Sequence, residues 1–378
     1  MVSVLQFNKN LALHQFYHFS IKLDYFGVVK NSFLLLVTVL LMTDLMAQKS
    51  YQIRTVAFYN VENLFDTEND TLIFDDERTA EGAYQWTETR YEKKIDNIAK
   101  VLSQVGFERS NALPDIIGVC EVENIRVVQD LVNHPLLLKG NYGIVHSDSP
   151  DERGIDVALL YKKNSFLPVS FQSVRLLLFS DEGFRDYTRD QLVVNGLLDG
   201  ESFSFIVNHW PSRSGGELRS RPNRIKAAQL NHRIIDSLRR GDVNSKIISM
   251  GDFNDDPIDD SLKKVLRTEG KQEKLDSTQL FNPMERFFRK GMGTLAYRDK
   301  WNLFDQFVMT PNILEDEDNY HFWKAGIFAP DWLKNKTGRY KGYPFRTYVG
   351  TRYQGGYADH FPVYLYLIRQ MDSPITDN

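Results

Sequence analysis

The sequence predicts one α/β domain in which stacked β-sheets are covered by helices. Its 378 residues, 42% of them hydrophobic, are enough for a sizeable core. From Tyr51 onward, short apolar segments alternate with amphipathic ones, and several apolar segments follow one another midway. No repeat, low-complexity run or linker divides this part of the chain. Residues 48–378 are therefore predicted to form a single domain.

The first half of this domain alternates between strands and helices. Residues 53–60 (IRTVAFYN) and 114–122 (PDIIGVCEV) are predicted as strands because they are rich in β-branched residues. Residues 86–105 are predicted as a helix, and the face that supports it carries Ile95, Ile98, Leu102 and Val105. A short helix is predicted at 124–132.

The second half contains more strands in succession. One long helix is predicted around residues 224–238. The predicted strands are residues 155–163, 191–198, 202–210, 246–252, 303–310 and 360–368.

The N-terminus has the pattern of a secretory signal. Lys30 precedes an apolar run at residues 33–42, and the run ends in the small-residue exit LMAQ. The run is short for a membrane span and Asp44 closes it, so residues 1–47 are predicted as a signal peptide cleaved after Ala47. The residues before Lys30 are unusual for a signal, which suggests that the start is mis-assigned and lies at Val29. A retained membrane anchor or an interfacial helix is the alternative.

The overall charge excludes a global nucleic-acid-binding surface. The chain has 46 Lys and Arg against 50 Asp and Glu, a net charge of -4. Any site for a polyanion must therefore be local. The one cysteine, Cys120, excludes an internal disulfide framework and is predicted to be a small buried hydrophobic residue.

Polar side chains stand at the ends of the predicted strands. These residues are Asn60, Glu121, Asn208, His209, Asp252, Asn254, Asp359 and His360. Loops held by a rigid sheet are where binding and catalytic groups concentrate, so the stretch GDFNDDP (251–257) is predicted to form one wall of a pocket.

The residue types at these positions favour phosphoester hydrolysis. Carboxylate and amide oxygens suit Mg²⁺, Mn²⁺ or Ca²⁺, and histidines transfer protons near neutral pH. No serine or cysteine stands out as a nucleophile. Attack of water on a phosphodiester needs a metal to stabilise charge, a base for the water and an acid for the leaving oxygen.

Six motifs occur in a recognisable order: FYNVEN, GVCEVEN, VNHWPSR, GDFNDDP, FDQFVMT and YADHFPVYL. Together they resemble the endonuclease/exonuclease/phosphatase superfamily, which includes DNase I, over roughly Arg54 to Ile368. The chain looks like a secreted bacterial member. The resemblance implies a four-layered α/β sandwich, in which two packed, mostly antiparallel β-sheets are flanked by helices.

The resemblance also implies roles for individual residues. Glu121 and Asn60 would bind the metal. Asp252 would orient or deprotonate the attacking water, and Asn254 would steady the phosphate. His209 and His360 would form an acid and base pair across the scissile phosphate.

Further assignments by resemblance concern positioning and phosphate binding. Asp359 would fix the tautomer of His360, and Asp305 would lie near the metal or the histidine. Arg189 would approach the substrate phosphate, with Asn208 and Arg213 as further phosphate-binding candidates. Asp156 is only a candidate for the family's second acidic residue.

Several residues also have a purely structural explanation. Asn60 could cap a turn, and Asp305 could cap or pair structurally. Asp255 and Asp256 are expected to be turn residues before Pro257. Arg213, Arg219, Arg221 and Arg224 could hold a polyanion or only solvate a loop and helix start. Four of the other histidines, expected on the surface or in loops, are His134, His146, His232 and His321.

The function that these residues favour is an exported, metal-dependent endonuclease of the periplasm or extracellular space, acting on DNA or RNA as a monomer without a stable membrane anchor. The alternative is a phosphatase or phosphodiesterase for a lipid or small phosphoester. A catalytically silent binding protein is disfavoured because the matched positions are intact.

Overall fold

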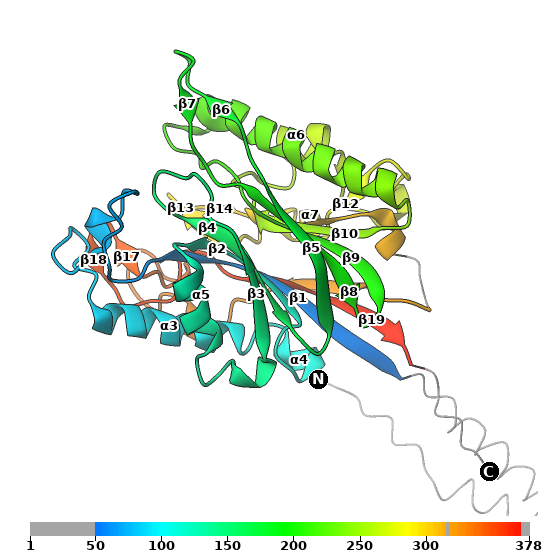
Figure 1. Ribbon diagram of the computed structural model, residues 1–378, viewed down its shortest axis with the longest axis horizontal. Helices are drawn as coiled ribbons and strands as arrows, with labels where there is room; N and C mark the ends of the chain where they lie inside the picture. The colour runs from blue at the N-terminus through cyan, green and yellow to red at the C-terminus, as the bar shows by residue number, and fades with distance from the viewer. Residues whose placement is uncertain (1–49, 315–317, 372–378) are drawn as a thin grey trace, which may run out of the picture. The chain divides into compact units, whose positions relative to one another are not determined.

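Two large β-sheets pack against each other in the region Tyr51–Gln370, and helices cover their outer faces (Figure 1). The computed structural model describes residues 50–314 and 318–371. The predicted signal peptide, residues 1–47, lies outside the described residues. Among the described residues, no helix is both long enough and apolar enough to cross a bilayer.

The first sheet has six strands in the order β16-β19-β1-β2-β4-β3. β1 and β2 are parallel, and the other neighbours are antiparallel. The strands are β1 (Tyr51–Leu64), β2 (Ile116–Val122), β3 (Tyr142–His146), β4 (Asp156–Lys162), β16 (His321–Ile327) and β19 (Val363–Gln370).

The second sheet has seven strands in the order β11-β12-β15-β10-β9-β8-β5. Two neighbouring pairs, β10 with β9 and β11 with β12, are parallel. The strands are β5 (Phe166–Val174), β8 (Gln191–Leu198), β9 (Glu201–His209), β10 (Lys246–Asp252), β11 (Thr268–Glu269), β12 (Leu280–Phe281) and β15 (Asp305–Met309).

Three small hairpins lie outside these sheets. Their paired strands are β6 (Leu178–Phe179) with β7 (Arg185–Asp186), β13 (Leu295–Tyr297) with β14 (Lys300–Asn302), and β17 (Tyr348–Val349) with β18 (Arg352–Tyr353).

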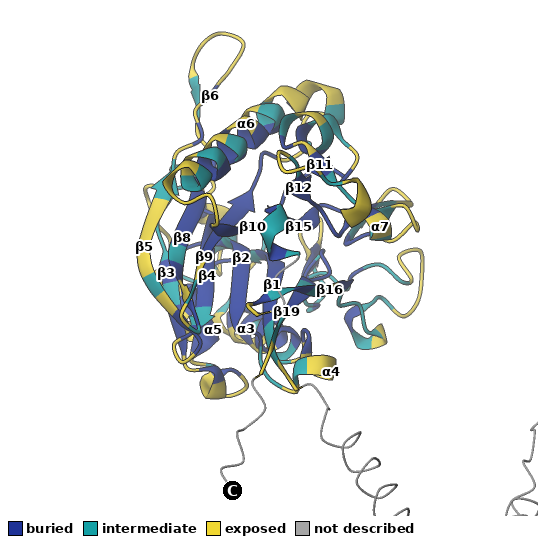
Figure 2. Cartoon of the chain, turned by 90° about the vertical axis from the view of Figure 1, so that its right-hand side faces the viewer, coloured by how far each residue is buried: buried dark blue, intermediate teal, exposed yellow. Residues whose placement is uncertain are grey.

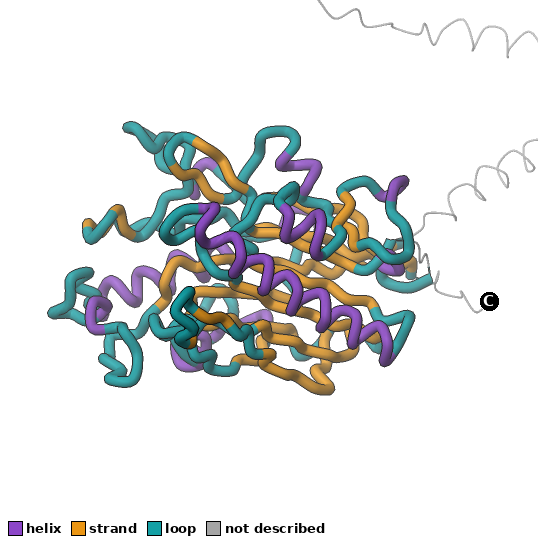
Figure 3. Tube along the Cα trace, turned by 90° about the horizontal axis from the view of Figure 1, so that it is seen from above, coloured by secondary structure: helices purple, strands orange, loops and turns teal. Residues whose placement is uncertain are grey.

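Helices form the outer layers. The α-helices are α3 (Glu88–Leu102), α4 (Phe107–Ser110), α5 (Ile125–Val132), α6 (Glu217–Gly241) and α7 (Glu285–Phe288). Shorter 3₁₀ or π turns are η1 (Asp76–Arg78), η2 (Leu138–Gly140), η3 (Ser261–Val265), η4 (Gln272–Lys274), η5 (Pro311–Ile313) and η6 (Asp331–Leu333). In Figure 3 the long helix α6 crosses the outer face of the second sheet.

Alternation along each strand explains the layers. On β1, Val56 and Phe58 pack into the core between the sheets, whereas Ala57 and Tyr59 face the helices α3 and α5. On the second sheet, Ile247 and Ile206 pack against the apolar face of α6. Figure 2 shows the resulting buried strands between partly exposed helices. The predicted four-layered sandwich with mostly antiparallel sheets is confirmed.

The differences from the predicted elements have local causes. β1 runs to Leu64, past the expected end at Asn60, through an irregularity in its pairing with β2. Helix α6 begins at Glu217, earlier than expected, and contains Pro222 in its second turn. Strands β3, β5 and β16 were not predicted. β5 is mostly exposed, as an edge strand can be, so it lacks the apolar run that would have marked it.

Candidate active site

Parallel strand pairs bring the predicted residues to one edge of the sandwich. Asn60 on β1 pairs with Cys120 on β2, one residue before Glu121. Asp252, the last residue of β10, pairs with His209 on β9 and with Asp305 on β15. Because these strands end together, side chains from both sheets converge there.

Asn60 joins the two sheets at this edge. Its Nδ2 lies 3.1 Å from Glu121 Oε1 and 3.1 Å from Asp252 Oδ2, and its Oδ1 accepts the backbone N–H of Glu62 at 2.9 Å. The other oxygen of Glu121, Oε2, accepts the backbone N–H of Asn63 at 2.9 Å. Asn60 is 1% exposed. Its side chain therefore links a carboxylate from each sheet and is not merely a turn cap.

The backbone around these residues adopts left-handed conformations. Glu62 and Asn63 have φ of 54°, Glu121 has φ of 62°, and Asn254 has φ of 50°. Non-glycine residues seldom occupy this region, and those that do concentrate at functional sites. Here the conformation turns the Glu121 carboxylate toward the end of β1, where it accepts the N–H of Asn63.

His360 is held by Asp305. Its Nδ1 lies 2.6 Å from Asp305 Oδ2, and its Nε2 lies 3.8 Å from Asp252 Oδ2. Since a carboxylate only accepts, Nδ1 carries the proton and Nε2 faces the site. Burial lowers the pKa of His360, but the charges of Asp305 and Asp252 outweigh it and raise this pKa well above its ordinary value.

His209 has the opposite tendency. Its Nε2 lies 3.7 Å from Glu121 Oε1 and 3.9 Å from Asp252 Oδ2, while its buried Nδ1 has no hydrogen-bond partner among the described residues. Burial and, to a lesser extent, the charge of Arg189 lower its pKa well below the ordinary value. Both histidines lie near Asp252, but the pKa of His209 is lowered and that of His360 is raised.

Asp252 lies at the centre of this cluster. Burial raises its pKa to about 7; His360 opposes the shift and Asp305 adds to it. Its Oδ1 accepts the backbone N–H of Asn254 at 2.9 Å, and its Oδ2 accepts from Asn60. A carboxylate so placed has one oxygen held by the loop and the other facing both histidines.

The donor set fits a divalent cation. Glu121 Oε1 and Asp252 Oδ2 converge on the same Asn60 nitrogen, and Asn60 Oδ1 retains a second lone pair beyond its bond to Glu62. Such hard oxygen donors suit Mg²⁺ or Mn²⁺. A second group, Asp252, Asp305 and His360, has ligand atoms within 4.8 Å of one another, but Asp305 and His360 already bond to each other.

The chain matches a known protein family over most of its length. The model described as the Endonuclease/Exonuclease/phosphatase family matches residues 55–369. The chain belongs to the endonuclease/exonuclease/phosphatase family. Members of this family are phosphoester hydrolases and typically use a divalent metal. No curated protein matches the chain by sequence.

Solved structures agree on the fold. The chain is similar to an endonuclease/exonuclease/phosphatase family protein from Bacteroides thetaiotaomicron, with 18% identity, a TM-score of 0.51, and coverage of 86% of this chain and 98% of that chain. It is similar to TDP2 from Caenorhabditis elegans, with 12% identity, a TM-score of 0.52, and coverage of 83% and 74%. Humanized TDP2 from D. rerio has 12% identity, a TM-score of 0.50, and coverage of 84% and 99%.

Asp359 does not hold His360 in this endonuclease/exonuclease/phosphatase family chain. The Asp359 carboxylate accepts from Arg346 Nη2 at 2.8 Å, and Arg346 Nε also donates to Glu62 Oε1 at 3.3 Å. The prediction for Asp359 is therefore wrong, and Asp305 performs that positioning. Although Asp359 and His360 are adjacent in the sequence, their side chains bond to different partners, Arg346 and Asp305.

The three predicted phosphate-binding residues are engaged elsewhere. Arg189 is buried and donates to Asp151 Oδ2 at 2.9 Å and to the Trp210 carbonyl at 2.8 Å. Asn208 is fully buried and donates to Ser249 Oγ at 2.9 Å. The complete burial of Asn208 contradicts direct phosphate binding by this residue, whereas the phosphate contact of Arg189 stays a prediction.

Arg213 is likewise occupied. It donates to the Asn254 carbonyl at 2.9 Å and to Asp259 at 2.7 Å, and its guanidinium lies 4.6 Å from the Phe304 ring centroid. Arg213 therefore holds the GDFNDDP loop in place, and its phosphate contact stays a prediction.

Asn254 turns out of the strand geometry of β10 shortly after Asp252. With φ of 50° it leaves the strand geometry, and its Nδ2 donates to the Trp210 carbonyl at 3.0 Å. Arg189 donates to the same carbonyl. Trp210, which sequence reasoning missed, thus ties both residues to the segment that carries His209. Its place directly after His209 in VNHWPSR was the available signal.

Asp255 and Asp256 are structural, as predicted, but they are buried rather than exposed turn residues. Asp255 accepts from Arg224 Nε at 2.6 Å and from Ser261 Oγ at 2.7 Å. Asp256 accepts the backbone N–H of Leu303 at 2.7 Å. Of the two roles considered for Arg224, neither polyanion binding nor exposure to solvent fits, because its side chain is fully buried and pairs with Asp255.

His146 is also not a surface residue. It ends strand β3, its side chain is 4% exposed, and its Nε2 lies 3.2 Å from Asp156 Oδ2. Asp156 also accepts from Ser149 Oγ at 2.5 Å. This pairing accounts for Asp156 structurally. The other three histidines, His134, His232 and His321, are partly exposed.

A network of polar contacts around Glu62, beside the site, was not predicted from the sequence. Glu62 accepts the backbone N–H of Thr347 at 2.6 Å, and Lys94 of helix α3 lies 3.9 Å from Glu62 Oε2. Glu62 stands inside FYNVEN, so the motif marked its position, whereas Lys94 had no motif around it. The network joins β1, α3 and the segment 346–359.

Proposed function

We propose that the protein is an exported, metal-dependent phosphodiester hydrolase that cleaves DNA or RNA by in-line attack of water. The observation that carries this proposal is the convergence of Glu121, Asp252 and the Asp305-supported His360 at one sheet edge. Export rests on the charge, apolar run and small-residue exit of residues 30–47.

Each side chain has one task in the proposed reaction. Asp252 orients the attacking water and accepts its proton. His360 is protonated on both ring nitrogens because the charges of Asp305 and Asp252 raise its pKa; Asp305 holds Nδ1, and Nε2 donates its proton to the leaving oxygen. His209, 3.9 Å from Asp252, is the second imidazole, facing the scissile phosphate.

Glu121 and Asn60 would hold a divalent cation, Mg²⁺ or Mn²⁺, with Ca²⁺ as a further candidate. Such a cation, when bound, stabilises negative charge on a phosphoryl oxygen. Asn254 and Arg189 act indirectly in this scheme, since both fix the Trp210 carbonyl next to His209.

The experiment compares hydrolysis of plasmid DNA, RNA and a chromogenic phosphodiester with and without a chelator. Activity is expected to disappear in the chelator and to return with excess Mg²⁺ or Mn²⁺. Glu121→Gln should raise the metal concentration needed for half-maximal activity, with Glu92→Gln, on the exposed face of α3, as the control. Full activity in the chelator would remove the metal from the mechanism.

A second candidate is hydrolysis of a small phosphoester. It is favoured by a pocket of about 230 Å³ lined in part by Asp359, a volume that suits one small substrate unit. Turnover of a sugar or lipid phosphoester together with no turnover of either nucleic acid would select this candidate.

A further inference from the structure

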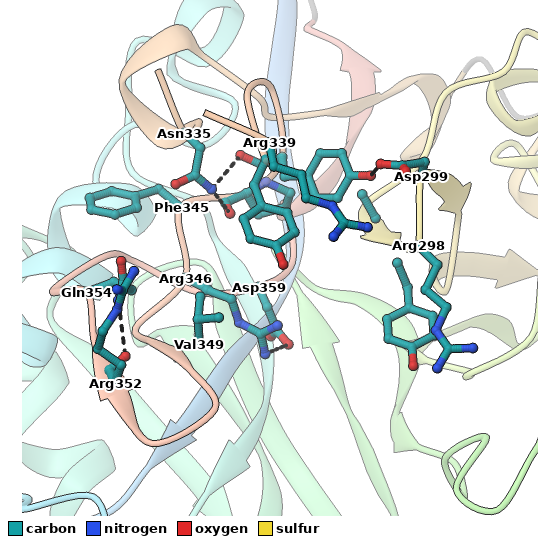
Figure 4. Close-up of a pocket in the computed structure, with 15 residues that line it drawn as sticks. Arg298, Asp299, Asn335, Arg339, Phe345, Arg346, Val349, Arg352, Gln354 and Asp359 are labelled. Carbon is teal, nitrogen blue, oxygen red and sulfur yellow. Dashed lines mark hydrogen bonds and ion pairs between the residues drawn. The ribbon is translucent and has the colours of Figure 1, made fainter. Parts of the chain in front are cut away.

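A pocket of about 230 Å³ adjoins the catalytic edge (Figure 4). Its walls come from the β13–β14 turn, the loop 335–346, the β17–β18 hairpin and Asp359. We call it the arginine–tyrosine pocket, after the residues Arg298, Arg339, Arg346, Arg352, Tyr297, Tyr340 and Tyr343.

This pocket is physically joined to the catalytic residues. Arg346 bridges Asp359, at 2.8 Å, and Glu62, at 3.3 Å. Asp359 immediately precedes His360, and Glu62 follows Asn60 by two residues. In Figure 4, Arg346 and Asp359 lie together in the wall of the pocket. The same ion pairs therefore hold the wall of the pocket and the backbone beside His360 and Asn60.

The pocket is locally basic although the chain carries a net charge of -4. Four arginines line it against the two acids Asp299 and Asp359. Arg346 is paired, but within the described residues Arg298, Arg339 and Arg352 form no ion pair with a carboxylate. Unpaired guanidinium groups beside a phosphoester site favour a second anionic group of the substrate.

Tyrosine rings form the apolar part of the pocket. Tyr297 is 62% exposed and Tyr340 is 44% exposed. Arg298 lies 5.2 Å from the centroid of the Tyr297 ring and Arg339 lies 5.9 Å from that of Tyr340, so each ring has a guanidinium beside it and is otherwise open to solvent. Tyr343 lies 5.8 Å from Tyr340, and its hydroxyl donates to Asp299 at 2.7 Å. Trp301 packs edge-on against Tyr343 at 5.6 Å. Partly fixed aromatic rings next to arginines are the combination that stacks bases of a single nucleic-acid strand.

We propose that the arginine–tyrosine pocket binds one nucleotide of a single nucleic-acid strand next to the scissile phosphate. Its base stacks on the tyrosine rings, and its phosphate lies at the unpaired arginines. The volume supports one unit rather than a larger ligand, because sites for drug-sized molecules measure roughly 300–1,000 Å³. The proposal rests on the proposed nucleic-acid hydrolysis and specifies its substrate as single-stranded.

The test compares two substrates on the full-length enzyme with Mg²⁺. One is a single-stranded oligonucleotide, and the other is methyl 4-nitrophenyl phosphate, which has no second phosphate and no base. Tyr340→Leu should lower kcat/KM on the oligonucleotide by about 5- to 150-fold, the factor expected for loss of one stacked base. The double variant Arg339→Gln with Arg352→Gln should lower it by at least about tenfold. Both variants should stay within about twofold of wild type on methyl 4-nitrophenyl phosphate.

Matched controls lie far from the pocket. Arg233→Gln removes one exposed charge from α6, and Tyr51→Leu removes a ring that is 44% exposed at the far end of β1. Both should leave the two rates unchanged. Equal losses on both substrates in the pocket variants, or no loss on either, would overturn the proposal. A wild-type enzyme that hydrolyses methyl 4-nitrophenyl phosphate but neither binds nor cleaves the oligonucleotide would instead overturn the nucleic-acid function itself.

Discussion

Asp305 and His360 are 55 residues apart in the sequence, yet the Asp305 Oδ2 and His360 Nδ1 atoms lie 2.6 Å apart. Asp359, the chain neighbour of His360, instead pairs with Arg346. A short charge-assisted hydrogen bond fixes both the ring orientation and the tautomer of an imidazole. At the scale of single residues, the hydrogen-bond partner of His360 is decided by the packing of the sheets and not by adjacency in the sequence.

This choice gives a matched comparison. Asp305→Asn should lower kcat by about a hundredfold or more, because His360 loses the acceptor that holds its tautomer. Asp359→Asn makes the same change at a carboxylate that does not bond to the His360 ring, so kcat should fall by less than about tenfold. Steady-state kinetics on a chromogenic phosphodiester decide between them. Equal losses in the two variants would contradict the assignment of Asp305.

Asp255 gives a second prediction at this scale. It pairs at 2.6 Å with Arg224, which is fully buried, so Asp255→Ala leaves this guanidinium with only the more distant carboxylate of Glu217, at 3.8 Å. The free energy of unfolding should fall by about 3–5 kcal/mol, more than the loss expected for an exposed turn residue. Asp260→Ala, which breaks only the exposed pair with Lys264, should change it by less than about 0.5 kcal/mol. Urea unfolding of both variants measures the difference, and similar values would refute the buried pair's importance.

At the scale of elements, helix α3 is tied to the segment that carries Asp359 through one buried lysine. Lys94 Nζ donates to Thr347 Oγ1 at 2.6 Å and to the Tyr357 carbonyl at 2.7 Å. Burial lowers the pKa of Lys94 from 10.5 to about 8, although Glu62 and Asp359 oppose the shift. The helix thereby fixes the wall next to the catalytic edge.

The lowered pKa predicts a pH dependence of stability. Between about pH 8 and pH 10.5 the unfolded chain binds more protons at Lys94 than the folded protein does, so the contribution of Lys94 to stability rises with pH in this window. Lys94→Met should remove that rise. Lys93→Met, on the exposed side of the same helix, should retain it. Urea midpoints from pH 7.5 to 10.5 provide the measurement, and identical pH profiles for both variants would rule out the shifted lysine.

At the scale of the whole molecule, two parallel strand pairs from two sheets bring the residues of the candidate active site to one edge. β1 with β2 supplies Asn60 and Glu121, and β9 with β10 supplies His209 and Asp252. Helices on the outer faces bury the remaining sides of both sheets. The strands therefore hold the site rigidly, and the loops around it are expected to determine which substrate binds.

The chain as a whole is also predicted to be exported. Protein recovered from its host should begin near Gln48, because the pattern of residues 30–47 favours cleavage after Ala47. Intact-mass measurement tests this, with Ala47→Asp as a variant that should block processing. An intact mass that retains residues 1–47 would contradict export by cleavage.

The sequence by itself determined the layers of sheets and helices and most residues of the candidate active site. Alternation of apolar residues specified the principal strands, because burial of one or both faces demands it. Motif order indicated the family, and polar strand ends marked Asn60, Glu121, His209, Asp252 and His360 as neighbours.

Only the tertiary structure decided which side chains actually meet. It assigned Asp305 rather than Asp359 to His360, buried Arg189 and Asn208 in structural bonds, and joined Arg346 to Asp359 beside a basic pocket. Sequence patterns specify which face a residue occupies, but contact between distant residues depends on strand register, left-handed turns and loop paths. Those arise only when the whole chain packs, since each is stabilised by partners far away in the sequence.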